Sequence, residues 1–147
     1  MRYFEDYVLG QRVDVGSFRL KRDDIIEFAS RWDPQPFHLG DAAAKDSIFG
    51  ELIASGCHLV AMSINLISNS EERGCVLAAL GGEEVRFIRP VRPDEPVFLT
   101  VECVEARPSE SKPDRGIIKN RLTLTNHRQQ IVLRFTDVLF VARRPEG

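Results

Sequence analysis

Residues 55–74 read SGCHLVAMSINLISNSEERG, and this stretch decides the predicted fold. The apolar residues of segment 59–67 recur at the spacing of a helix face, and Met62 adds apolar character on a further side. Ser55 is a favourable N-cap residue, and glycine, as at position 74, commonly follows a helix end. We therefore predict a helix between Ser55 and Gly74 that is buried rather than resting on a surface.

The second half of the chain is typical of β-strands, because it is rich in Val, Ile, Leu, Thr and Phe. The segments RPVRPDEP, RPSESKPD and NHRQQ separate the apolar stretches and have turn compositions. A helix-rich first half followed by a strand-rich second half indicates an α+β fold, with a curved antiparallel sheet wrapped around the buried helix. The predicted strands are Glu83–Ile88, Pro96–Ala106, Arg115–Thr125 and Ile131–Ala142.

The first third of the chain is predicted to hold shorter elements. Asp24 precedes a helical apolar pattern and Glu27 follows three residues later, which resembles a capping box. Pro34 should end that helix at Asp33, because the residue before a proline is pushed out of the α region. The predicted elements are a strand at Val13–Leu20, a helix within residues 21–32, a short helix at Asp41–Asp46 and an irregular segment at Gly50–Ala54.

The composition fits one domain, residues 1–147, in a cytoplasmic protein. Hydrophobic residues make up 43% and charged residues 29% of the chain, which is enough for a packed core. The net charge of −2 argues against a nucleic-acid-binding surface. The three cysteines form no CxxC pair, so a disulfide framework and a zinc site are not expected. We expect neither a signal peptide nor a membrane-spanning helix.

The stretch WDPQPFHLG, residues 32–40, places a carboxylate and an imidazole on a segment stiffened by two prolines. Asp33 and His38 are therefore candidates for an acid–base pair, because imidazole exchanges protons near neutral pH and a shielded carboxylate is a better base. The alternative is structural: Asp-Pro commonly opens a turn, and a histidine beside Phe37 can simply be packed.

Gly56, at the predicted start of the buried helix, is a candidate for binding a carbonyl oxygen. Its backbone N–H has no partner within the helix and lies at the positive end of the helix dipole. A carbonyl oxygen placed there would be polarised as in an oxyanion hole. The alternative is that Ser55-Gly56 is only a favourable helix start.

These features resemble the MaoC-like dehydratases, which include the (R)-specific enoyl-CoA hydratases. Residues 33–38, DPQPFH, are similar to the family motif D-x-N-P-[LIV]-H. Residues 49–63, FGELIASGCHLVAMS, resemble the family segment entering its central helix. Residues 80–96, LGGEEVRFIRPVRPDEP, are similar to its first strand after that helix. The resemblance runs from about Val13 to Ala142.

The resemblance implies a hot-dog fold, in which an antiparallel sheet wraps a long helix, and association at least as a dimer. It also implies that Asp33 and His38 hold and activate water, while the Gly56 N–H binds a thioester carbonyl. The chain departs from the family pattern at two positions of the motif. Gln35 replaces an asparagine that helps fix the loop, and Phe37 replaces an aliphatic residue and would reshape the acyl pocket.

The predicted function is hydration of 2-enoyl thioesters or dehydration of 3-hydroxyacyl thioesters, with coenzyme A as the expected carrier. No metal and no redox cofactor is implied, and coenzyme A enters as part of the substrate. Further candidates for substrate contact are Ser55, which stands where some relatives carry histidine, and the cations Arg89 and Arg92. Two alternatives stay open: an acyl-CoA thioesterase and a non-catalytic partner subunit. The partners expected are an acyl-CoA and a second copy of the chain, with no nucleic acid and no membrane.

Overall fold

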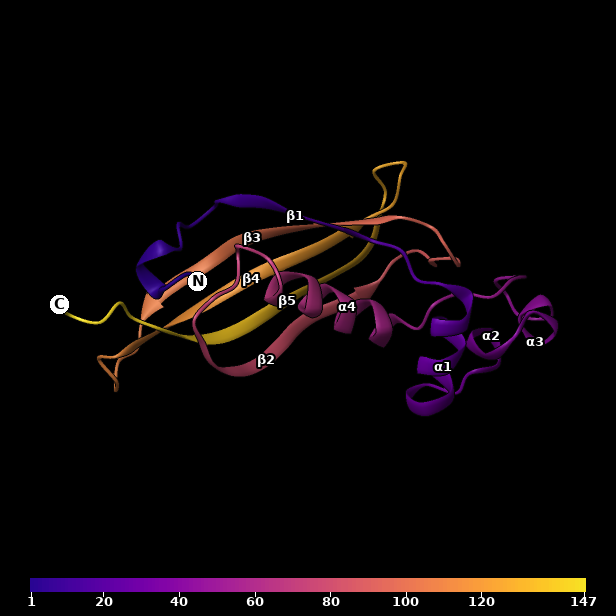
Figure 1. The fold of residues 1–147 in the computed structure, drawn as a ribbon, viewed down its shortest axis with the longest axis horizontal. Helices are drawn as coiled ribbons and strands as arrows, with labels where there is room; N and C mark the ends of the chain where they lie inside the picture. The colour runs from indigo at the N-terminus through magenta and orange to yellow at the C-terminus, as the bar shows by residue number, and fades with distance from the viewer.

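A computed structural model describes all 147 residues, and its main feature is one five-stranded antiparallel sheet with a helix across its inner face (Figure 1). The strand order is β1-β3-β4-β5-β2, and every neighbouring pair is antiparallel. The α+β architecture predicted from the sequence is therefore confirmed. The strands are β1 (Arg12–Phe18), β2 (Val76–Phe87), β3 (Val97–Pro108), β4 (Arg115–Thr125) and β5 (Ile131–Ala142).

The helices occupy two places relative to the sheet. The longest, α4, lies against the sheet, whereas α1, α2 and α3 gather beyond one end of it, next to the first residues of α4 (Figure 1). This arrangement brings the segment between α1 and α2 close to the start of α4. The helices are η1 (Phe4–Asp6), α1 (Arg22–Trp32), α2 (Pro36–Leu39), α3 (Asp41–Lys45) and α4 (Gly56–Ser68).

The main core lies between α4, the short helices and the inner face of the sheet. Leu59 of α4 packs in one buried cluster with Leu99, Leu122 and Leu133, each from a different strand. Each of these four side chains is at most 3% exposed, so each contributes about 1.5–3 kcal/mol through burial. The core therefore holds the first turns of α4 firmly against the sheet.

Helix α1 begins earlier than the sequence pattern predicted. Its first residue is Arg22 and its N-cap is Lys21, whose side chain makes no capping hydrogen bond. The predicted capping box at Asp24 and Glu27 is therefore wrong. Asp24 instead lies in the first turn, where its charge is favourable near the positive end of the helix dipole. The end of the helix is as predicted, because Trp32 is its last residue and Asp33 its C-cap.

Helix α4 ends at Ser68, well before Gly74. Polar side chains just beyond Ser68 satisfy the last carbonyls: Asn69 Nδ2 donates to Asn65 O at 2.9 Å, and Ser70 Oγ donates to Ile67 O at 2.8 Å. Such local hydrogen bonds compete with continuation of a helix. Gly74 has a different role, because a Cβ there would fall on the Tyr7 hydroxyl.

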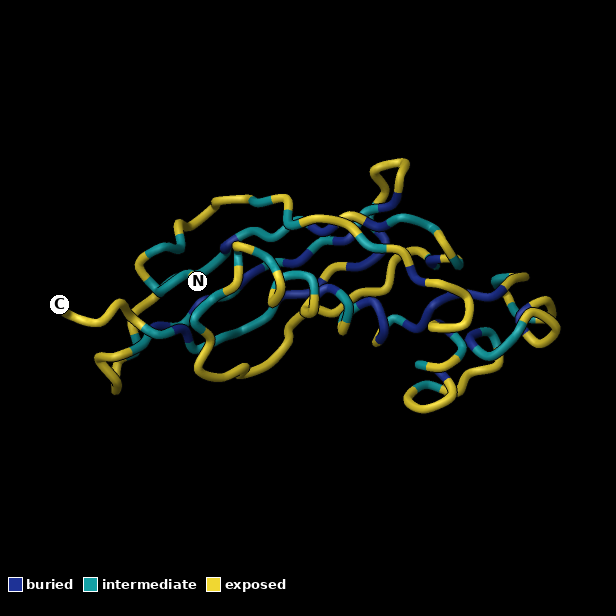
Figure 2. The backbone as a smooth tube through the Cα atoms, in the orientation of Figure 1, coloured by how far each residue is buried: buried dark blue, intermediate teal, exposed yellow.

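Strand β2 starts at Val76, seven residues before the predicted strand at Glu83. Its first half, VLAALGG, is rich in Ala and Gly, which are depleted in strands and conceal the pattern. β2 is the edge of the sheet and is exposed along its whole length (Figure 2). Helix α4 packs against the sheet through its buried residues, and its residue Ile64 is 49% exposed.

Candidate active site

Asp33 and His38 meet at the junction of α1 and α2. Asp33 is the C-cap of α1, and Pro36 starts α2 with its fixed φ angle suited to a first helical position. His38 therefore lies on a short helix that the sequence analysis did not predict. Its Nε2 atom is 3.5 Å from Asp33 Oδ2, and the His38 side chain is buried. The structure brings this predicted pair together.

The second ring nitrogen of His38 indicates which tautomer is present. His38 Nδ1 lies 2.7 Å from the backbone carbonyl oxygen of Ile53. A carbonyl only accepts, so Nδ1 carries a hydrogen, and in the neutral ring Nε2 has a free lone pair. Nε2 and the Asp33 carboxylate are then two acceptors that face each other. Such a pair can share a proton on Nε2 or hold a water between them.

Ser55 makes a contact that sequence reasoning missed. The residue occupies the N-cap position of α4, but its side chain makes no capping hydrogen bond. Ser55 Oγ instead donates to Asp33 Oδ2 at 2.7 Å, and Ser55 is fully buried. The hydroxyl thus holds the Asp33 carboxylate in place, a role that the sequence analysis did not assign to it. No local pattern could have shown this, because an N-cap serine is the ordinary reading before a helix.

Gly56 is the first residue of α4, as predicted, and its N–H donates no hydrogen bond within the chain. The ring of Phe87, the last residue of β2, packs directly on it, so that a Cβ at position 56 would fall on ring atoms. Any larger residue at position 56 would displace the Phe87 ring from this contact. Phe87 is 60% exposed, and the sequence carried no signal for this contact.

Gln35 and Phe37, the two departures from the family motif, have different surroundings. Gln35 is exposed, and its side chain makes no hydrogen bond, although its carbonyl accepts from the His38 N–H at 2.9 Å. Phe37 packs edge-on against His38, with ring centroids 4.6 Å apart, and against Phe49 at 5.1 Å. Phe37 therefore supports the His38 ring, and neither residue borders a large cavity.

The two candidate cations differ in how they are paired. Arg92 pairs with Glu51, which raises the pKa of the Arg92 guanidinium, and its Nη1 lies 3.9 Å from Glu95. Arg89 pairs with no acid, and its Nη1 donates to the Ile131 carbonyl at 2.6 Å. Both side chains lie on the connection that follows β2, away from the Asp33–His38 pair in sequence. Of these two arginines, Arg89 is therefore the one whose charge is not balanced by an acid.

His58 has the surroundings of a packed histidine, in agreement with its position inside α4. Its ring stacks on Phe28, with centroids 4.3 Å apart and planes 5° from parallel. Burial lowers the pKa of His58 and exceeds the opposite effect of Asp24, while Nδ1 is buried without a partner. His58 therefore packs α4 against α1 and is not part of the Asp33–His38 pair.

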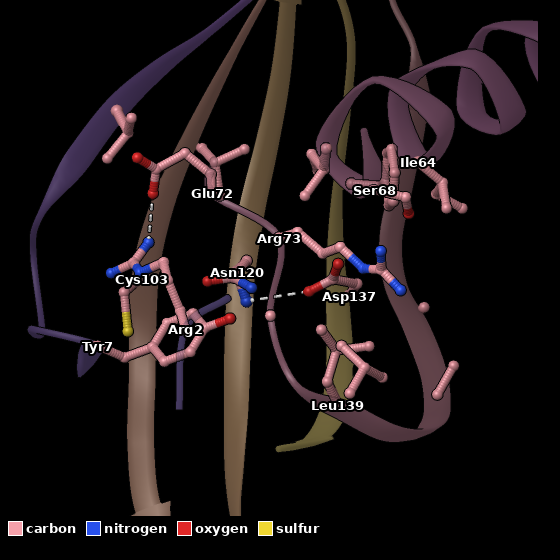
Figure 3. Close-up of a pocket in the computed structure, with 18 of the residues that line it drawn as sticks. Arg2, Tyr7, Ile64, Ser68, Glu72, Arg73, Cys103, Asn120, Asp137 and Leu139 are labelled. Atoms are coloured by element: carbon pink, nitrogen blue, oxygen red, sulfur yellow. Dashed lines mark hydrogen bonds and ion pairs between the residues drawn. The ribbon is translucent and has the colours of Figure 1, made fainter. Parts of the chain in front are cut away.

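A cavity of about 630 Å³ lies between α4 and the sheet, within the usual range for small-molecule sites (Figure 3). It begins at Val60, one helical turn after Gly56, and continues past Ile64 to Ser68. Asp33, His38 and Gly56 do not line it. The cavity therefore lies next to the candidate reacting groups and extends along α4, the helix that starts at Gly56.

Other groups in the chain are arranged as follows. No three His, Cys, Asp or Glu side chains are gathered closely enough to hold a metal ion. The cysteines Cys57, Cys75 and Cys103 are free thiols. None of the helices has the length and the apolar character needed to cross a bilayer.

Comparison with known proteins shows matches over most of the chain. The family model described as “MaoC like domain” matches residues 6–126. A MaoC-like dehydratase from Rhodospirillum rubrum has the same fold, with a TM-score of 0.89 and 33% identity over 99% of this chain and 100% of that one. The uncharacterized protein YdeM of Bacillus subtilis is 29% identical over 85% of this chain and 88% of its own length. (R)-hydratase PhaJ1 of Pseudomonas aeruginosa covers 97% of this chain and 86% of its own, with a TM-score of 0.77 and 21% identity, a likeness of fold alone. The fold of this chain is the hot-dog fold.

Proposed function

Because the chain belongs to the MaoC-like dehydratase family, we propose that it hydrates 2-enoyl thioesters and dehydrates 3-hydroxyacyl thioesters, with coenzyme A as the carrier. The observation that carries this proposal is the Asp33–His38 pair, with Oδ2 and Nε2 3.5 Å apart beside the start of α4. A carboxylate and an imidazole at this separation supply the base and the acid that addition of water requires.

In the hydration direction, Asp33 removes a proton from water while the water oxygen bonds to C3 of the substrate. The electron pair of the C2–C3 double bond moves towards the thioester carbonyl and forms an enolate. His38, protonated at Nε2 and stabilised by the neighbouring carboxylate, gives that proton to C2. The proton on Asp33 then passes to Nε2 and restores the starting state, so the net change is the addition of one water.

The enolate oxygen is stabilised in this proposal by the Gly56 N–H. That N–H is unused within the chain and lies at the N-terminus of a helix of 13 residues. A helix N-terminus favours negative charge, and a donor aimed at developing charge lowers the barrier. The Phe87 ring must turn away for a carbonyl to reach this position, which its exposure permits.

Coenzyme A carries phosphates that need cationic contacts, and Arg89 and Arg92 remain our candidates. Arg89 is the stronger of the two on electrostatic grounds, because no acid pairs with it. The charge of Arg92 is already balanced by Glu51 and Glu95. Replacing Arg89 should therefore weaken binding of the substrate more than replacing Arg92.

We further propose a homodimer that uses β2, with the acyl site near the subunit boundary. An edge strand presents unpaired backbone groups that can pair with another chain. Leu77, Leu80 and Val85 on this strand are each more than 40% exposed. A second copy of β2 would pair the backbone and cover these side chains together.

The decisive experiment is a hydration assay on crotonyl-CoA and on longer and branched enoyl-CoAs. Asp33→Asn and His38→Ala should each lower kcat by ~10² or more, and the double variant should be little worse than the worse single, because the two residues act as a unit. Release of free coenzyme A would instead identify a thioesterase. Binding without either product would identify a partner subunit. Near-normal hydration by a folded Asp33→Asn or His38→Ala variant would overturn the assignment of the pair.

A further inference from the structure

The cavity beside α4 is apolar along most of its length but holds a polar group set on the sheet (Figure 3). Asn120 of β4 and Asp137 of β5 are directly opposite each other in the strand register, and both line the cavity. Tyr7 and Cys103 line it as well. These four residues, here called the polar patch, line the cavity together, with Asn120, Asp137 and Cys103 on the sheet and Tyr7 on the segment before β1. Polar side chains in such a cavity are stable only when they have hydrogen-bond partners.

Asp137 has few partners in the polar patch. It pairs with no cation, and its hydrogen bonds come from Asn120 alone, whose backbone N–H donates to Oδ1 at 3.3 Å. Burial raises the pKa of Asp137 to about 6 and that of Tyr7 to about 12. Asp137 is half-buried, and since a carboxyl withdrawn from water is costly without partners, it has capacity to accept from a group that enters the cavity.

The position of Asp137 relative to Gly56 follows from the strand register. Phe87, whose ring packs on Gly56, is paired with Leu133 of β5. Asp137 is four residues further along that strand, which corresponds to ~14 Å. On the helix side, Ile64 is eight residues past Gly56, or ~12 Å along α4. The helix and the strand thus run from the proposed carbonyl position to the polar patch in parallel.

The wall between these two ends suits a hydrocarbon chain. Val60 and Ile64 border the cavity from α4, and Val85 and Phe135 border it from the sheet. An acyl chain whose thioester oxygen lies at Gly56 would pass these apolar side chains first and reach Asp137 after ~14 Å. The cavity continues beyond Asp137 past Ile67, Leu139 and Val76, and a chain of this span ends beside the Asp137 carboxylate.

We propose that the cavity receives an acyl chain that carries a hydroxyl group at its far end, and that Asp137 determines this specificity. The inference rests on the proposed function, because it places the thioester at Gly56. A hydroxyl tail can donate to the Asp137 carboxylate, whereas a plain hydrocarbon tail would dehydrate the carboxyl and leave it unpaired. Sites that hydrogen-bond a substrate hydroxyl discriminate strongly against the analogue that lacks it.

The test is a binding comparison that does not depend on turnover. Calorimetry would measure the Kd values of two saturated, unreactive acyl-CoAs of equal length, matched to the span of ~14 Å along the strand, one with a terminal hydroxyl and one without. The native protein should bind the hydroxylated chain about tenfold more tightly, which corresponds to one net hydrogen bond. Asp137→Leu should reverse the preference, and Asp137→Asn, which keeps an acceptor, should retain part of it.

The matched control is Asp14→Asn on β1, an exposed strand carboxylate that bonds to Thr100 and does not line the cavity. This variant should leave the ratio of the two Kd values unchanged. An equal or stronger affinity of the native protein for the plain chain would overturn the proposal. So would a hydroxyl preference that survives in Asp137→Leu. If Asp137→Leu does not fold, Asp137→Asn replaces it in the test. The proposal is then overturned if Asp137→Asn keeps the full hydroxyl preference and if that preference is the same for acyl chains of different length.

Crotonyl-CoA separates this inference from the proposed function, because its acyl chain is too short to reach the polar patch. Hydration of crotonyl-CoA at equal rates by the native protein and the Asp14→Asn control is the expected result. If crotonyl-CoA is hydrated but no hydroxyl preference exists, the inference about Asp137 fails and the lyase stands. If the hydroxyl preference exists without hydration, the lyase fails and the specificity of the cavity stands.

Discussion

Ser55 Oγ donates a 2.7 Å hydrogen bond to Asp33 Oδ2, across 22 residues of sequence. Ser55 immediately precedes Gly56, so the same backbone turn carries the partner of the carboxylate and the N–H that we propose for the thioester carbonyl. Any displacement of this turn moves both groups together. The contact thus couples the water-activating side of the candidate site to its carbonyl-binding side.

Ser55→Ala should therefore lower kcat by about tenfold and change KM little, because Asp33 loses a positioning hydrogen bond that matters for the reacting geometry. The measurement is steady-state hydration of crotonyl-CoA.

Ser63→Ala is a matched control for that variant. Ser63 is equally buried on α4, and its hydroxyl donates to the Leu59 carbonyl at 2.8 Å, away from Asp33. It should lose a similar amount of stability, about 1 kcal/mol, with little change in kcat. An equal fall in kcat in both variants would show that Ser55 does not position Asp33.

The parts of the site that depend on local sequence could be predicted, and those that depend on distant contacts could not. Pro34 and Pro36 indicated where α1 ends and where Asp33 and His38 lie, because prolines act on adjacent backbone. The contact of Ser55 with Asp33 depends on how α1 docks beside α4.

The same distinction applies to the fold. Strands β4 and β5 were predicted with the bounds observed, because both are rich in strand-forming residues and are bounded by turn segments. Strand β2 was predicted only in its last part, because an edge strand rich in Ala and Gly carries a weak pattern. The packing of Phe87 on Gly56 follows from the pairing of β2 with β5, which local reading does not reveal.

Gly56→Val tests whether the thioester carbonyl binds at Gly56. The test has to be made in a background without the Phe87 ring, because that ring packs on Gly56. The single variant should be destabilised, because its side chain falls on the Phe87 ring. In a Phe87→Ala background this overlap is gone, and thermal unfolding should return close to that of Phe87→Ala alone. The value of kcat/KM should nevertheless stay lower by ~10², as when an oxyanion donor is lost.

Phe87→Ala alone is the reference for that comparison and should retain turnover. A Gly56→Val/Phe87→Ala protein that hydrates crotonyl-CoA as fast as Phe87→Ala would exclude Gly56 from the mechanism.

The role of β2 in association can be tested with one charge. Leu80→Glu places a carboxylate on the exposed edge strand, where Leu80 is 46% exposed, and should convert a dimer into monomers. Phe98→Glu is the control, because Phe98 has similar exposure, 43%, but lies on β3 inside the sheet. Light scattering at micromolar concentration should show a monomer only for Leu80→Glu. A native protein that is monomeric and active would contradict the proposed dimer.

Asp137 should give the stability of the protein a distinct pH dependence. Its pKa is raised from 3.8 to about 6 in the folded chain, so the folded state binds this proton more tightly than the unfolded state does. The cost of the buried charge is absent at low pH, grows as the pH rises from about 4 to 6, and is complete above that. Asp137→Asn removes the charge, so the variant should gain stability relative to the native protein as the pH rises.

Urea unfolding of both proteins at about pH 4.5 and about pH 8 measures this gain, which should be about 2 kcal/mol between the two conditions. Burial lowers the pKa of His58, which has the opposite effect, because the native protein is destabilised as the pH falls through 6.5. That contribution is present in both proteins and cancels in their difference. Asp14→Asn, which removes an exposed carboxylate, should show no such gain. A difference between Asp137→Asn and the native protein that is constant with pH would show that Asp137 is not held in a desolvated position.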